Sequence, residues 1–129
     1  MPASPAILMV GLPCDHPLVA AWIFDPIDVR DGLASPLQAV ADAGYTITPH
    51  WIGPDAEGAA GMPGLVALLK ANDYDAVIIG AGMRLQASLT EFFEEIVNTV
   101  KEHAPRARMG FNSSPQSTLE AVKRACPLA

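Results

Sequence analysis

The stretch Ala6-Ile7-Leu8-Met9-Val10 is a continuous apolar run that ends at Gly11. Farther along the chain, Ala76-Val77-Ile78-Ile79 has the same form and ends at Gly80. A strand that is apolar without alternation is typical of a parallel sheet covered by helices on both faces. These two runs therefore predict the two central strands of an α/β domain.

Two other runs alternate polar residues with apolar or small ones, Tyr45–Thr48 and Arg108–Asn112. Alternation indicates a strand that is only partly buried, as at the edge of a sheet. With the continuous runs in the centre and the alternating runs outside, the four strands take the spatial order 2-1-3-4.

Helical patterns follow the strands. The first has Ser35 as its N-cap and stops at Gly44, and the second spans residues 65–71. The third begins with a capping box of Ser88 and Glu91 and continues with an apolar stripe of period 3.6 as far as residue 100. The fourth begins at Ser114, with proline at its first helical position.

Strands that alternate with helices imply parallel pairing and right-handed crossovers. We therefore predict one domain over residues 1–129, a three-layer α/β/α fold with a four-stranded parallel sheet of order 2-1-3-4, flavodoxin-like or Rossmann-like. The strand order reverses between the first and third strands. A ligand crevice is expected outside the carboxyl ends of those two strands.

Composition and charge indicate which classes of partner and which cellular location to expect. The chain is 50% hydrophobic and carries a net charge of −6, with its eight Lys and Arg residues scattered. Nucleic acid is not an expected partner, because binding it needs clustered cations. No membrane span is expected, and no Lys or Arg precedes Arg30 to form a signal peptide, so a cytoplasmic location is expected. Cys14 and Cys126 are too few for a disulfide framework and are expected to be free thiols.

Several polar residues follow the third and fourth strands at the predicted crevice. The backbone around Gly80 and Gly82, with the side chain of Arg84, would hold a phosphate or carboxylate. The alternative is that the glycines only make a tight turn and that Arg84 is solvated. Asn112 and Ser113 follow the fourth strand and would orient the ligand.

The loop after the first strand carries reactive groups. Cys14 and His16 are the candidate catalytic residues, His16 as a general acid or base and Cys14 as a thiolate. A plain loop is the alternative. Asp15, His16 and His50 would be the only metal ligands nearby, but no metal-binding spacing occurs and no metal site is predicted.

The sequence identifies no cofactor. No P-loop and no complete dinucleotide fingerprint occurs, which disfavours nucleoside triphosphates and NAD, whereas a flavin is left open. The long segment Pro17–Ala34, with aromatic residues, is either a lid or an interface with a second subunit, so a homo-oligomer is also left open.

The segment Asp73–Gly80 resembles the third strand of response-regulator receiver domains, and Asn112-Ser113-Ser114 lies where that family has its Ser/Thr switch residue. The pattern also resembles small bacterial proteins of this fold with no assigned activity. The phosphoacceptor aspartate of receiver domains would fall at Gly80, and their fifth strand with its lysine has no counterpart. Of their acidic pair, only Asp15 remains, so the resemblance does not imply phosphoryl transfer.

The sequence therefore favours two functions. The first is binding of a small anionic metabolite at the ends of strands one and three, with catalysis by Cys14 or His16 left open. The second is a non-catalytic, receiver-like interaction module that acts through a helix face or as a homodimer.

Overall fold

A computed structural model describes residues 4–11, 37–54, 58, 61–113 and 117–128. Its sheet has four parallel strands in the order β2-β1-β3-β4, which confirms the predicted flavodoxin-like arrangement. The strands are β1 (Ala6–Gly11), β2 (Thr46–Trp51), β3 (Ala76–Ile79) and β4 (Arg108–Phe111). The continuous apolar runs are indeed central, and the alternating runs form the two edges.

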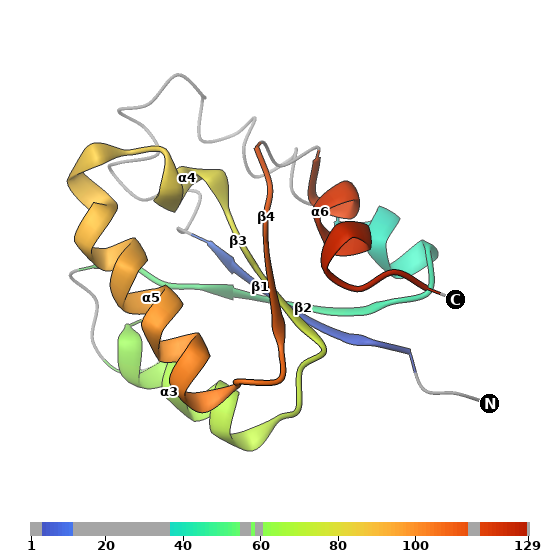
Figure 1. The fold of residues 1–129 in the computed structure, drawn as a ribbon, viewed down its shortest axis with the longest axis horizontal. Helices are drawn as coiled ribbons and strands as arrows, with labels where there is room; N and C mark the ends of the chain where they lie inside the picture. Colours follow the sequence, from blue (N-terminus) through green and yellow to red (C-terminus); the bar gives the residue numbers. More distant parts are fainter. Residues whose placement is uncertain (1–3, 12–36, 55–57, 59–60, 114–116, 129) are drawn as a thin grey trace.

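Helices cover both faces of the sheet (Figure 1). On one face α3 (Met62–Ala71) and α5 (Thr90–His103) pack over one set of alternate strand residues, including Val10 and Ile79. On the other face a helix that includes residues 37–42 and α6 (Thr118–Ala125) pack over the remaining set. Both faces of β1 and β3 are therefore buried, which explains why these strands are apolar throughout.

Two glycines shape this second face. Gly44 has a φ of 108° just after residues 37–42, a left-handed conformation that ends the helix as predicted. Gly110 lies in β4 where α6 approaches closely. A Cβ added there would lie 2.7 Å from Ile78 Cδ1 and 3.2 Å from the backbone oxygen of Ala121. The missing side chain of Gly110 therefore allows α6 to pack against β4.

The predicted start of the third helix is wrong. A 3₁₀ turn, η2 (Ala87–Leu89), comes first, and α5 then begins at Thr90 without a side-chain cap. The N–H groups of Leu89 and Thr90 bond to the carbonyls of Gln86 and Ala87, so a 3₁₀ turn precedes the helix in place of a Ser88 capping box. The apolar stripe is confirmed, because Phe92, Ile96 and Val100 are buried.

A short helix that was not predicted, α4 (Ala81–Arg84), follows β3 directly. It replaces the expected tight turn and carries Arg84 as its last residue. The beginning of the helix at residues 37–42 and that of the predicted fourth helix at Ser114 lie outside the described residues, as does the segment Pro17–Ala34. In the described part of the chain, no helix has the length and apolar character needed to cross a membrane.

Candidate functional site

Asn112 lies at the carboxyl end of the sheet, immediately after β4, and is 2% exposed. Its side-chain oxygen accepts the backbone N–H of Ala81 at 2.8 Å, and its amide nitrogen donates to Thr118 Oγ1 at 3.1 Å. The carboxamide therefore links the start of α4 to the start of α6. This structural role accounts for a buried asparagine at a position where the sequence predicts a ligand contact.

The backbone around the two predicted glycines is also largely used within the protein. The N–H of Gly80 donates to Val10 O at 2.9 Å, and the carbonyl of Gly82 accepts from Gln86 Nε2 at 3.0 Å. Gly80 has a φ of −70°, a value that any residue adopts. The N–H of Ala81 bonds to Asn112, and Arg84 supplies the exposed charged side chain of this segment.

The guanidinium of Arg84 reaches the end of β4, where one Nη2–H donates to Asn112 O at 3.0 Å. From α6, Arg124 donates in the same way to Phe111 O at 2.9 Å. A guanidinium has five N–H donors, so one backbone bond orients each side chain and leaves further donors for a ligand. Two oriented arginines thus flank the end of one strand.

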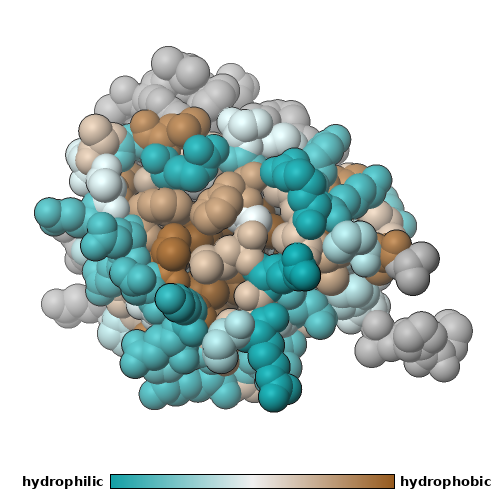
Figure 2. Space-filling view, viewed as in Figure 1, coloured by the Kyte–Doolittle hydropathy of each residue, from teal (hydrophilic) through white to brown (hydrophobic). Residues whose placement is uncertain are grey.

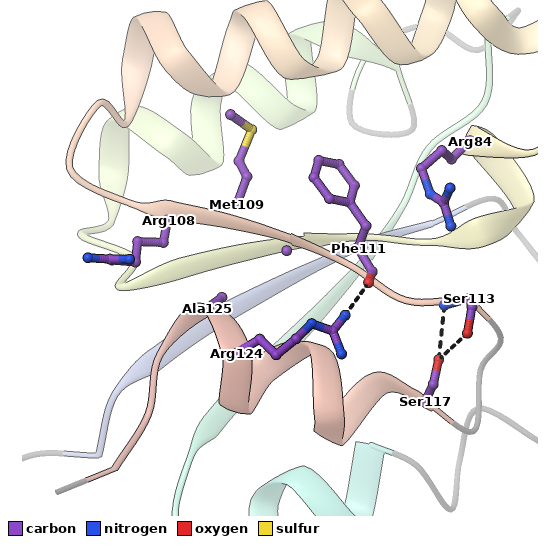
Figure 3. A pocket seen from close by; sticks show the side chains of 9 residues that line it. Arg84, Arg108, Met109, Phe111, Ser113, Ser117, Arg124 and Ala125 are labelled. Atoms are coloured by element: carbon purple, nitrogen blue, oxygen red, sulfur yellow. Dashed lines mark hydrogen bonds between the residues drawn. The ribbon is translucent and has the colours of Figure 1, made fainter.

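Two serines lie beside these arginines (Figure 3). The N–H of Ser113 donates to Ser117 Oγ at 2.9 Å, and the two hydroxyl oxygens are 3.2 Å apart. Both serines and both arginines line one groove of about 710 Å³ along the outer side of β4. The rest of its lining consists of Arg108, Met109, Gly110, Phe111 and Ala125.

The charge of this groove is opposite to that of the whole chain. The chain has a net charge of −6, yet three arginines line the groove and no carboxylate appears among its described lining residues. Arginine forks match the geometry of carboxylate and phosphate oxygens, and serine hydroxyls add donors to such oxygens. The groove can therefore hold an anion.

His50 lies on β2 opposite Val10, near the carboxyl end of the sheet. Its Nε2 is buried and has no hydrogen-bond partner among the described residues. Burial disfavours the charged imidazolium and lowers the pKa of His50 below its usual value. The neighbouring Trp51 packs over Gly11, where a Cβ would lie 2.9 Å from its ring.

The cysteines and the candidate metal ligands of the sequence analysis lie partly outside the described residues. Cys14, Asp15 and His16 lie outside the described residues. Cys126 follows α6 as a free thiol, at the opposite end of the sheet from Arg84 and Ser113 and next to Ala125, which lines the groove. Within the described ranges, no three His, Cys, Asp or Glu side chains are grouped so that they could hold a metal ion.

A second hollow, of about 480 Å³, lies at that opposite end, between the carboxyl ends of α3 and α5. Asp73, Asp75, His103 and Arg106 line it with both signs of charge. It therefore lacks the single sign of charge that distinguishes the groove along β4.

Of the predicted ligand-binding residues, Arg84 and Ser113 line the groove, whereas Asn112 supports it from within. Ser117 and Arg124 were not among the predicted site residues. Arg124 lies seven positions after Ser117, two helical turns along α6, and this spacing is the signal that could have placed both on one face.

The fold defines an α/β/α protein, but the sequence matches no protein-family model and has no significant similarity to a curated protein.

Proposed function

We propose that this protein binds a small anionic ligand, a phosphorylated or carboxylated metabolite, at the carboxyl end of β4. The observation that carries the proposal is the pair Arg84 and Arg124, each oriented by one bond to a backbone carbonyl and both lining one groove with Ser113 and Ser117. The site lies beside the crevice that sheet topology predicts, moved outward from the ends of β1 and β3 to the end of β4.

Preorganisation supports binding at this place. A flexible arginine loses side-chain entropy when it orders around a ligand. Here the bonds of Arg84 to Asn112 O and of Arg124 to Phe111 O hold both side chains before a ligand arrives. Much of the ordering cost is then already met in folding. Catalysis by Cys14 or His16 remains a prediction on residues outside those described.

A thermal-shift screen with inorganic phosphate, citrate and phosphorylated metabolites tests the proposal. A ligand at about 100 times its dissociation constant stabilises the folded state by about 2.7 kcal/mol, which raises the melting temperature by several degrees. In Arg84→Ala this rise should disappear. The melting temperature without ligand should also fall, because the lost bond from the charged guanidinium to Asn112 O contributes about 1.5–3 kcal/mol, so the rise is measured for each protein from its own value without ligand.

Arg106→Ala is the matched control, since this exposed arginine lines the hollow at the opposite end of the sheet. It should respond to the same ligands as the wild type. If no anion stabilises the wild type, or if both variants respond equally, the proposed site is wrong.

A further inference from the structure

β4 is an edge strand whose outer side faces the groove. The N–H of Arg108 donates to Asp75 O, toward β3, and backbone polar groups alternate in direction along a strand. The backbone N–H and carbonyl groups of Met109 and Phe111 therefore point outward, away from β3. Phe111 O accepts from Arg124, which confirms this direction, and no described residue bonds to the N–H or the carbonyl of Met109.

One side of this edge is apolar. The side chains of Met109 and Phe111 point toward α5 and are only half-buried (Figure 3). The ring centroid of Phe111 lies 5.8 Å from that of Phe93 on α5, which is also half-buried, as is Val97. Figure 2 shows the result, a hydrophobic patch over β4 between α5 and α6 that is bordered by hydrophilic residues. Such a patch with a polar rim is typical of an interaction surface.

The other side of the edge is cationic. Arg108 and Arg124 lie on the α6 side of β4 and are both exposed, whereas Gly110 is buried beneath α6. A strand laid along β4 would therefore meet apolar side chains on one face and guanidinium groups on the other. Because successive side chains of a strand point to opposite faces, the matching ligand alternates apolar with acidic residues.

We infer that the outer edge of β4 accepts, as a fifth strand, an extended segment of a partner protein in which apolar and acidic residues alternate. The N–H and carbonyl of Met109 and the N–H of Phe111 bond to its main chain. Its apolar side chains pack on Met109, Phe111 and Phe93, and its carboxylates bind Arg108 and Arg124. The inference rests on the proposed function in one respect, because Arg124 belongs to both sites.

Charge decides between this partner and a second copy of the chain. Pairing of β4 with β4 about a two-fold axis sets the same patch against itself. Arg108 and Arg124 of one copy would then face the same arginines of the other, and like charges at such short range are destabilising. An acidic segment has the opposite effect.

The test measures fluorescence anisotropy with a labelled, end-blocked seven-residue peptide of alternating valine and glutamate. A peptide of alternating valine and lysine is the charge control. A valine–glutamate peptide N-methylated at alternate amides, prepared in both registers, is the backbone control. We expect the valine–glutamate peptide to bind and the valine–lysine peptide not to bind. The N-methylated form that lacks the bonding amides should bind at least about tenfold more weakly than the form methylated in the other register.

Two variants of the protein test the same main-chain bonds. Met109→Pro removes the outward N–H and leaves the bonds to β3 in place, since proline is tolerated at edges where its nitrogen faces outward. Met109→Ala removes the same side chain and keeps the N–H. With both folded by circular dichroism, Met109→Pro should bind the peptide about tenfold more weakly than Met109→Ala.

The outcomes separate the two proposals. Equal binding of the normal and both N-methylated peptides overturns strand addition and leaves an anion site alone. Stabilisation by citrate without any peptide binding overturns strand addition and supports the proposed function, whereas the absence of both overturns both. A dimer of the free protein that Met109→Pro disperses would assign the edge to a second copy and overturn the acidic partner.

Discussion

The side-chain oxygen of Asn112 accepts the backbone N–H of Ala81, a residue 31 positions earlier, at 2.8 Å inside the protein. The same side chain donates to Thr118 at the start of α6. One buried carboxamide therefore connects the two helices, α4 and α6, whose arginines flank the groove. The position of the anion site depends on this connection, and so does the stability of the fold around it.

Asn112→Ala should lower the free energy of unfolding by about 1–3 kcal/mol, because it leaves the buried Ala81 N–H without this acceptor and removes the bond to Thr118 Oγ1. Urea unfolding measures the loss. Asn72→Ala is the control, since its amide bonds to Leu68 O at an exposed position and its loss should cost less than about 1 kcal/mol. A loss at Asn112 no larger than at Asn72 would contradict the linking role.

Gly110→Ala should destabilise the protein by about 1–3 kcal/mol, because its Cβ would press on Ile78 and on the backbone of Ala121. Gly80→Ala is a matched control. Its Cβ would meet Met9 and Val10 at an ordinary 3.5 Å, and its φ of −70° suits alanine. Thermal unfolding of both variants measures the two losses of stability. Equal losses would mean that α6 does not approach β4 as closely as described.

His50 should make stability depend on pH. Its pKa in the folded protein lies below that in the unfolded chain, about 6.5, so the unfolded state takes up protons first as the pH falls. The resulting stability is fully present above pH 6.5 and is lost below it. His50→Phe lacks this pH-dependent contribution to stability, while the other two histidines are common to both proteins.

The measurement for His50 is urea unfolding of both proteins from pH 8 to pH 5. The wild type should lose stability relative to His50→Phe across this range. A difference between the two proteins that stays constant with pH would show that the imidazole titrates alike in both states.

Much of the fold could be predicted because burial leaves a direct mark on composition. The unbroken apolar runs at residues 6–10 and 76–79 require cover on both faces of the sheet, and the partial alternation at Arg108–Phe111 indicates an edge. The start of α5 was missed because the pattern of Ser88 and Glu91 suits a capping box. The chain instead forms a 3₁₀ turn over Ala87–Leu89 before α5 begins.

The site could be predicted only in part. Arg84 and Ser113 come within a few residues of the ends of β3 and β4, so sheet topology places them at the carboxyl end of the sheet. Nothing local to Asn112 shows that its partners are Ala81 and Thr118, because those contacts exist only once the chain has folded. Arg124 was missed for a similar reason, since its position beside β4 depends on how α6 packs over Gly110.

We propose above that the arginine groove at the end of β4 binds anions. The most direct test is a two-dimensional NMR titration of the isotope-labelled protein with inorganic phosphate and then citrate, observing backbone amides and arginine side chains. We expect saturable shifts at Arg84, Ser113, Ser117 and Arg124. Shifts confined to the opposite hollow around Asp73 and Arg106, or no saturable shift at all, would contradict it.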